Sequence, residues 1–134
     1  MGNAALLRKV DAVTVKVTDL DRGLAFYRDR LGHHVNWRND AVGQIGLALP
    51  DSDTELVLTT ALAYEPNWLV ASADRAADVF RDAGGTVLTE PFDIPVGRVA
   101  VVSDPFGNVL VLLDLSKGRY ETDDQGQVIG VTLH

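Results

Sequence analysis

The chain contains no cysteine. That absence excludes disulfide bonds, thiolate catalysis and cysteine-ligated metal sites. Positive charge is also scarce, because 12 Lys and Arg residues stand against 19 Asp and Glu residues and the net charge is −7. Such a balance repels phosphate backbones, and no basic run stands out in the sequence. Nucleic acid is therefore not expected as a partner.

Long apolar runs are missing as well. No stretch approaches the roughly 18 residues of a membrane span, and the first ten residues, MGNAALLRKV, lack the apolar centre of a signal peptide. Gly2 could begin a myristoylation motif, but Leu6 stands where that motif has Ser or Thr. We therefore expect a soluble, cytoplasmic protein with no membrane partner. The 134 residues fit one domain, spanning 1–134, with a core of ordinary size.

The sequence does contain an internal repeat. Residues 26–29 (FYRD) match residues 79–82 (VFRD), and Gly32 matches Gly85, both at an offset of 53 residues. Residues 55–58 (ELVL) match residues 109–112 (VLVL) at an offset of 54. Three matches at nearly one offset indicate duplication of a unit of about 55 residues.

Each half predicts a strand, a helix and three further strands. Strands are expected at residues 12–17, 34–38, 43–49 and 55–60 and again at 68–72, 86–89, 98–103 and 109–115. The first helix, 20–31, is expected to begin at Thr18 or Asp19 and end at Gly32. Its apolar stripe is Leu20, Leu24, Tyr27 and Leu31. Each sheet should be covered on one side by its own helix.

Single residues predict a helix cap, a loop and two turns in the second half and the tail. Asp74 is expected to cap a helix that runs to Ala83 and stops at Gly84 and Gly85. Two prolines predict a loop over residues 90–97, because proline donates no ladder hydrogen bond. Residues 104–107 (DPFG) fit a type I turn, and Gln125 and Gly126 are expected to turn a small hairpin in the tail.

These features resemble the vicinal oxygen chelate superfamily, which includes glyoxalase I, the extradiol dioxygenases and the bleomycin-resistance proteins. The matching motifs are DL…FY…LG over residues 19–32 and DPxGN over residues 104–108. The resemblance implies an α+β fold of tandem βαβββ modules that form a cupped mixed sheet. Module one would span 10–60, the linker 61–67, module two 68–115 and the tail 116–134. It also implies a homodimer.

The resemblance makes a specific statement about metal binding. Enzymes of the superfamily hold a divalent metal with four His, Gln or Glu side chains, and the metal binds two adjacent substrate oxygens. Here the matching positions are Ala12, Val57, Trp68 and Val111, none of which binds a metal. A shift of one residue gives Asp11 or Val13, Leu56 or Leu58, Asn67 or Leu69, and Leu110 or Leu112, and no uniform shift assembles a site. We therefore expect a dry cavity with no metal and no cofactor.

Trp68 has two interpretations at this stage. It either packs in the core, as most tryptophans do, or forms a flat wall for a planar or apolar ligand. Strand alternation places Thr14, Lys16, Glu55 and Thr59 on the same face as Ala12 and Val57. Lys16 could hold a carboxylate or lie in solvent, Glu55 could be a general base or a surface acid, and Arg98 could clamp an anion. The candidate ligand-binding residues are Trp68, Val57, Val111, Ala12, Lys16, Thr59 and Arg98.

The two internal histidines, His33 and His34, do not make a metal site on this pattern, since neighbours on a strand point to opposite faces. Two functions are consistent with the sequence. The first is a metal-independent small-molecule-binding protein of the bleomycin-resistance type, which sequesters an antibiotic or metabolite. The alternative is a lyase, isomerase or dioxygenase that holds a metal through unexpected ligands, such as His34, Glu55, Glu90 or Asp114. A third possibility is an accessory module whose cavity is filled by its own side chains.

Overall fold

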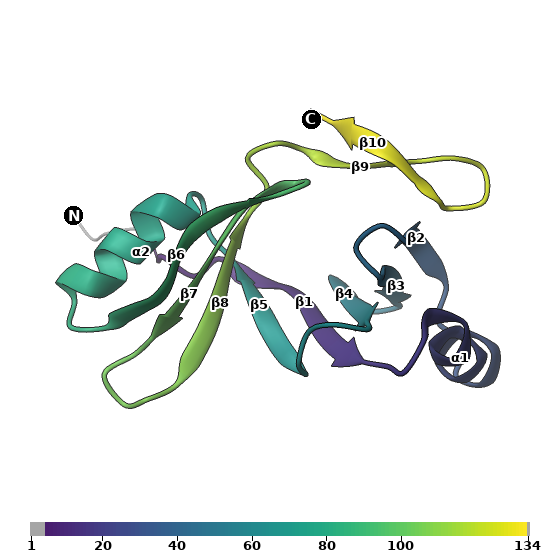
Figure 1. Ribbon diagram of the computed structural model, residues 1–134, viewed down its shortest axis with the longest axis horizontal. Helices are drawn as coiled ribbons and strands as arrows, with labels where there is room; N and C mark the ends of the chain where they lie inside the picture. Colours follow the sequence, from purple (N-terminus) through teal and green to yellow (C-terminus); the bar gives the residue numbers. More distant parts are fainter. Residues whose placement is uncertain (1–4, 134) are drawn as a thin grey trace. The chain divides into compact units, whose positions relative to one another are not determined.

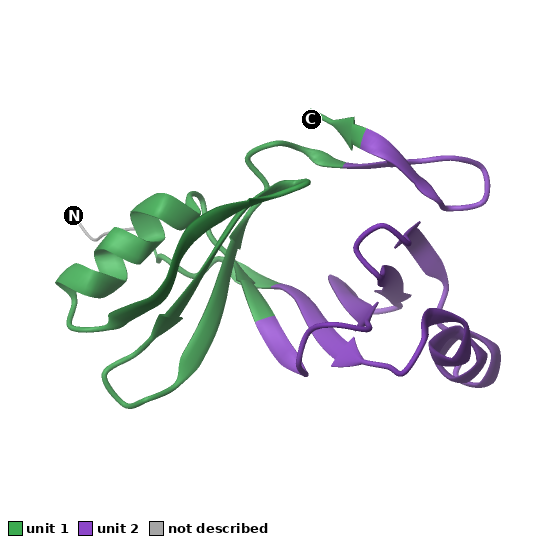
Figure 2. Cartoon of the chain, in the orientation of Figure 1, with its two compact units in different colours: residues 1–10, 67–119, 131–134 green, residues 11–66, 120–130 purple. Residues whose placement is uncertain are grey.

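The computed structural model describes residues 5–133 (Figure 1). The chain divides into two compact units (Figure 2). Unit 1 comprises residues 1–10, 67–119 and 131–134, and unit 2 comprises residues 11–66 and 120–130. No helix in the described part of the chain is long and apolar enough to cross a membrane.

Unit 2 carries the first βαβββ module. Strand β1 (Lys9–Lys16) leads to the short helix α1 (Leu20–Leu24), and three strands follow, β2 (Val35–Asn39), β3 (Gln44–Leu49) and β4 (Ser52–Thr59). The strand order is β2-β3-β4-β1, with β1 parallel to β4 and the other pairs antiparallel. One face of this sheet packs on α1 through Leu20, Leu24, Ile45, Leu47 and Leu58.

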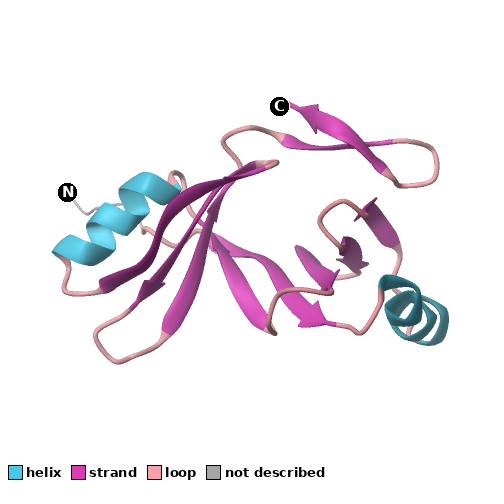
Figure 3. Cartoon of the chain, viewed as in Figure 1, coloured by secondary structure: helices cyan, strands magenta, loops and turns pink. Residues whose placement is uncertain are grey.

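Unit 1 repeats this arrangement. Strand β5 (Glu65–Leu69) leads to α2 (Ala73–Asp82), then to β6 (Thr86–Ile94), β7 (Gly97–Ser103) and β8 (Val109–Asp114). The order is β5-β8-β7-β6, with β5 parallel to β8 (Figure 3). The core beneath α2 contains Val70, Ala76, Val102 and Leu112. The α+β class and the βαβββ order in each half are thus confirmed, and each sheet carries its own helix.

The first helix differs from the prediction in its second half. After α1 the chain forms a π-helical segment, η1 (Ala25–Arg30), in which the Leu31 N–H donates to the Phe26 carbonyl at 3.0 Å. This i→i−5 spacing ends the regular 3.6-residue period. Leu31 consequently turns outward and is 51% exposed, although the period had placed it in the apolar stripe. The predicted start is correct, since the Asp19 carboxylate accepts from the Arg22 N–H at 2.7 Å.

Three predictions in the second half are wrong. Strand β5 begins at Glu65, inside the linker expected at 61–67, and ends at Leu69 rather than at residue 72. The loop expected at 90–97 is largely strand, because β6 continues to Ile94. β6 is the last strand in the order and its register shifts between Thr89 and Phe92, so Pro91 sits in an irregular edge strand that needs no ladder bond there. The cap of α2 is Ser72, whose hydroxyl accepts from the Arg75 N–H at 3.2 Å, and not Asp74.

The tail forms the hairpin that Gln125 and Gly126 predicted. Strands β9 (Arg119–Thr122) and β10 (Val128–Thr132) pair with each other. Gly126 has a φ of +81°, a left-handed conformation that glycine adopts without strain. Its carbonyl accepts from the Arg38 N–H at 2.8 Å, which joins the turn to β2 within unit 2.

Candidate functional site

The face of the unit 2 sheet turned away from α1, here called the far face, carries the candidate site. Leu56 and Leu58 of β4 pack toward α1, so strand alternation puts Glu55, Val57 and Thr59 on the far face. Ala12 of β1 lies opposite Glu55, and Thr14 lies opposite Val57. The far face therefore holds the first-module residues that the sequence had grouped together.

On this face, the Glu55 carboxylate is held by side-chain hydrogen bonds from the neighbouring residues of β2. Its two carboxylate oxygens accept from the Trp37 indole N–H at 2.9 and 3.1 Å, and Oε2 also accepts from the Asn36 amide at 2.9 Å. Two donors from β2 therefore fix the orientation of a carboxylate on β4. The carboxylate keeps capacity for further hydrogen bonds, because each oxygen carries two lone pairs.

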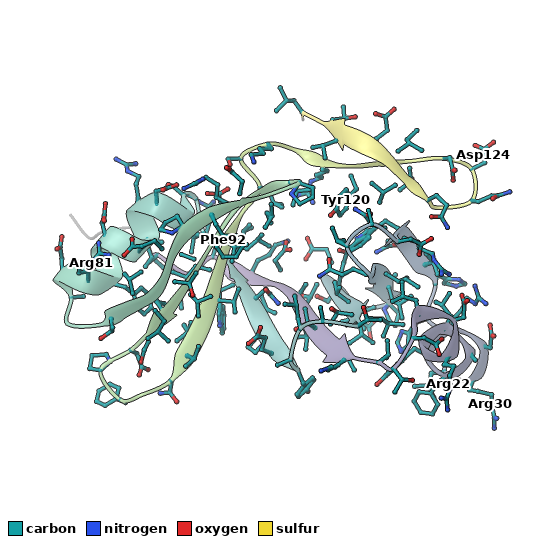
Figure 4. All side chains as sticks on the ribbon, viewed as in Figure 1. Arg22, Arg30, Arg81, Phe92, Tyr120 and Asp124 are labelled. Atoms are coloured by element: carbon teal, nitrogen blue, oxygen red, sulfur yellow. The ribbon has the colours of Figure 1, made fainter. Side chains whose placement is uncertain are left out.

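Trp37 lies flat on β3 because Gly46 leaves room for it. A methyl group at Gly46 would collide with the indole Nε1, Cε2 and Cδ1 atoms. The other partner of the indole is Tyr120, whose ring centroid is 4.8 Å away at an interplanar angle of 50°. Tyr120 is labelled in Figure 4 at the start of the tail. An aromatic pair and a carboxylate thus adjoin one another within unit 2.

The Tyr120 phenol is the second polar group of this cluster. Burial raises the pKa of the phenol, the nearby Glu55 carboxylate raises it as well, and a hydrogen bond from Asn39 at 3.5 Å opposes both effects. The hydroxyl therefore stays protonated at neutral pH and retains its proton for donation. We call Asn36, Trp37, Glu55 and Tyr120 the Glu55 cluster.

The remaining first-module candidates have other surroundings. Thr59 is fully buried, and its hydroxyl oxygen accepts from the Ala61 and Leu62 N–H groups at 3.2 Å, so it shapes the connector after β4. Lys16 is exposed at the end of β1. Ala12 and Val57 are buried, with 6% and 5% of their surface exposed. Of the predicted ligand-binding set in unit 2, these two line the far face beside Glu55.

In unit 1, Trp68 does not lie on the face predicted for it. It is half-buried, lies opposite Leu112 in β8 and packs against the core cluster beneath α2. The residue that pairs with Val111 is Asn67. The sequence alignment was thus out of register in this strand, and the contacts of Trp68 are those of core packing.

Removing the Trp68 side chain should consequently affect stability. We expect Trp68→Ala to lower the free energy of unfolding by about 2 to 4 kcal/mol, because it leaves a cavity in the core beneath α2. Urea denaturation followed by circular dichroism measures this loss. Trp37→Ala, which removes an indole held on the sheet surface, should be clearly less destabilising. Equal effects from the two substitutions would contradict the placement of Trp68 in the core.

Arg98 is not a free anion clamp. Its guanidinium binds the Asp74 carboxylate through two nitrogens at 2.8 and 3.1 Å and Asp93 through the third at 3.0 Å. It also donates to the Pro91 carbonyl at 3.0 Å. Its donors are therefore used in joining α2, β6 and β7 within unit 1, and the predicted anion would have to compete with these partners.

Two of the unexpected metal ligands that the sequence left open, Glu90 and Asp114, have other partners. Glu90 pairs with Arg81 at 2.7 Å. Asp114 is 3% exposed and accepts from the Ala73 N–H at 2.8 Å, the Arg98 N–H at 2.9 Å and the Ser116 hydroxyl at 2.7 Å. The His33 ring contacts the Ala48 carbonyl at 3.1 Å, and His34 is exposed.

The residues present do not fit the metal of the superfamily. Of the matching positions, Ala12 and Val57 lie in unit 2 and Val111 lies in unit 1. The residue opposite Val57 is Thr14, and the residue opposite Val111 is Asn67. Alanine and valine offer no donor atom, and an amide is a weak substitute for a carboxylate or imidazole. Across residues 5–133 no three His, Asp or Glu side chains gather in one place.

Comparison with known proteins identifies the family. Residues 12–113 match the glyoxalase-like domain. The chain belongs to this glyoxalase-like family. Over 101 residues it is 37% identical to proteins named "Putative glyoxylase CFP32" in Mycobacterium bovis and Mycobacterium tuberculosis. Those matches cover 69% of this chain and 39% of each relative, so the chain spans about two fifths of their length.

Solved structures agree on the fold of this glyoxalase-like chain. Methylmalonyl-CoA epimerase from Mycobacterium tuberculosis matches with a TM-score of 0.62 and 22% identity, over 85% of this chain and 92% of that one. A Streptomyces coelicolor epimerase variant in complex with 2-nitronate-propionyl-CoA matches with a TM-score of 0.62 and 24% identity, over 81% and 97%. The resemblance to the vicinal oxygen chelate superfamily is thereby confirmed.

Sequence reasoning missed most of the Glu55 cluster. It proposed Glu55 but not Trp37, Asn36 or Tyr120. Trp37 was hidden because a register shift between Val35 and Trp37 breaks the strict alternation of β2. A signal did exist in the sequence, since a glycine in the neighbouring strand often marks a close approach by another group.

Proposed function

We propose that this glyoxalase-like chain is a metal-independent small-molecule-binding protein. The observation that carries the proposal is the chemistry of the far face. Where the superfamily has metal ligands, unit 2 offers Ala12 and Val57, and beside them stands the carboxylate of Glu55. A face of this composition suits hydrogen bonding and apolar contact rather than Lewis-acid chemistry.

The Glu55 cluster also suggests what kind of molecule would bind. Glu55 accepts hydrogen bonds, the Tyr120 hydroxyl can donate one, and the Trp37–Tyr120 pair offers aromatic surface. A ligand with an amine, amide or hydroxyl donor next to a planar or apolar group matches these three features. Sequestration of an antibiotic or a metabolite, as in the bleomycin-resistance members of the superfamily, is consistent with them. The proposal includes a homodimer, which light scattering after gel filtration would test.

Ligand titration tests this function. Trp37 adjoins the cluster whereas Trp68 is in the core, so a ligand on the far face should quench indole emission in the Trp68→Phe variant and not in Trp37→Phe. Bleomycin and methylmalonyl-CoA are suitable first probes, because the related proteins are named for them. Quenching that persists in Trp37→Phe and vanishes in Trp68→Phe would count against the proposed face.

Glu55→Gln tests the carboxylate itself. We expect this nearly isosteric change to weaken binding of a ligand with a cationic or N–H donor by about tenfold to a hundredfold, because it removes a charge-assisted hydrogen bond. The dissociation constant from the fluorescence titration is the readout. Glu121→Gln, in the tail, is the matched control and should leave the constant unchanged. If the ligand bound the Glu55→Gln and wild-type proteins with equal affinity, Glu55 would not be part of the binding site.

A second candidate is supported by the comparisons. The solved neighbours include epimerases and the curated relatives carry a glyoxylase name. In an isomerase or lyase of this type, Glu55 would take a proton from a carbon next to a carbonyl group, as a positioned carboxylate can. Turnover of an acyl-CoA or a 2-oxoaldehyde adduct, lost in Glu55→Gln, would favour this candidate over simple binding.

A further inference from the structure

Unit 1 contains a pocket of about 250 Å³ whose lining includes no residue of the Glu55 cluster. It is lined by the chain at the ends of the parallel strands β5 and β8, together with Arg8 and Arg119. The Arg8 N–H donates to the Leu69 carbonyl at 2.9 Å, which ties the segment before β1 to the end of β5. Two arginines that are distant in sequence therefore line one pocket.

The pocket carries positive charge in a chain whose net charge is negative. The protein carries a net charge of −7, and Arg38, Arg81 and Arg98 each bind nearby carboxylates. Arg8 and Arg119, by contrast, make no ion pair with any residue in the range 5–133, and no Asp or Glu lines the pocket. Two arginines without a carboxylate partner in an acidic protein are available for an external anion.

The Asp114 carboxylate precedes the pocket residues Leu115 and Ser116 in the chain but makes no ion pair with Arg8 or Arg119. Its oxygens accept hydrogen bonds from the N–H groups of Ala73, Arg98 and Ser116 and from the Ser116 hydroxyl. The rest of the lining is apolar, with Leu69, Val70 and Leu115. The volume is below the range of about 300 to 1,000 Å³ typical of drug-sized ligands. A small molecule with one charged end fits these limits.

We propose that this pocket binds a small oxyanion, a phosphate or a carboxylate, that carries a short apolar group. The planar forks of Arg8 and Arg119 would each donate two hydrogen bonds to the oxyanion. Leu69 and Leu115 would cover the apolar part. The site goes beyond the proposed function, because it uses no residue of the Glu55 cluster.

Amide chemical-shift titration of the full chain tests the site. The probes are inorganic phosphate, acetate and butyrate, added at constant ionic strength with chloride as the balancing anion. Saturable shifts are expected at the amides of Ala71, Leu115 and Ser116. Tighter binding of butyrate than of acetate would indicate that the natural ligand is a carboxylate with an apolar group. Tighter binding of phosphate than of both would indicate that it is a phosphate.

Arginine variants test whether the anion binds in this pocket. Arg8→Gln and Arg119→Gln should each raise the dissociation constant at least about tenfold, and Arg119→Lys should be intermediate because it keeps the charge and loses the fork. Arg75→Gln on α2 is the matched control and should change it less than twofold. A dispersed spectrum shows that each variant folds.

Three results would overturn the proposal: shifts that do not saturate in the wild-type protein, no change in the Arg8 and Arg119 variants, or an equal loss in Arg75→Gln. Because Glu55→Gln is expected to leave these shifts unchanged, failure here is distinct from failure of the Glu55 site.

Discussion

Asp114→Ala is expected to lower the free energy of unfolding by about 3 to 5 kcal/mol. The carboxylate is buried and accepts from the first N–H of α2, at Ala73, and from the Arg98 N–H at the start of β7. Alanine has no acceptor atom, so these buried N–H groups would lose their hydrogen-bond partner. Urea denaturation monitored by circular dichroism measures the loss.

Asp114→Asn removes the charge of the side chain but nearly keeps its shape, so it measures the contribution of the charge to stability. The amide keeps one acceptor oxygen, so its destabilisation should lie between those of the wild-type protein and Asp114→Ala. Asp124→Asn, in the exposed turn of the tail (Figure 4), is the control and should have no measurable effect. If Asp114→Ala were as stable as that control, the network would not hold unit 1 together.

The same carboxylate predicts a dependence of stability on pH. Burial by itself raises the pKa of Asp114, but the hydrogen bonds from Ala73, Ser116 and Arg98 outweigh it and bring the pKa below 3.8. A pKa that is lower in the folded state contributes stability that is present above the unfolded value and is lost as the pH falls through the folded value. Asp114→Asn should lack this acid-induced loss, which denaturation at a series of pH values below 5 would show.

Gly46→Ala is expected to disrupt the Glu55 cluster. The added methyl group would occupy the space of the Trp37 indole, so the ring must move and its N–H must leave Glu55. We expect a loss of about 1 to 3 kcal/mol in stability and at least a tenfold loss in affinity for any ligand that binds the cluster. The near-ultraviolet circular dichroism of Trp37 and ligand titration are the two readouts.

Gly130→Ala is the matched control for this change. A methyl group there would meet nothing closer than the Glu121 carboxylate at 3.7 Å, and neither glycine has a positive φ. The control should therefore retain both stability and binding. An unchanged near-ultraviolet spectrum in Gly46→Ala would show that Trp37 does not rest on Gly46.

The repeat and the strand periodicity predicted the larger part of the fold. The matches between residues 26–29 and 79–82 indicated two copies of one module, and both copies have the same strand order. The errors have local causes. A π-helical segment removed Leu31 from the apolar stripe, an edge position allowed Pro91 within a strand, and Ser72 rather than Asp74 caps α2.

The candidate site was predictable only in part. Strand alternation correctly placed Glu55 beside Val57, since β4 is regular. It failed for Trp37, where β2 is irregular, and it put Trp68 on the wrong face because the alignment was out of register in β5. Tyr120 comes from the tail, whose return to β2 through the Arg38–Gly126 hydrogen bond depends on tertiary structure alone.

The proposed metal-independent function requires that no metal ion binds at Ala12, Val57 and Val111, whose side chains have no donor atom. Elemental analysis after incubation with Zn²⁺, Ni²⁺, Mn²⁺ and Fe²⁺ followed by desalting measures this most directly. Well under one equivalent of any metal per chain is the predicted result. One equivalent that is retained, and that is lost together with ligand binding or turnover on chelation, would contradict it.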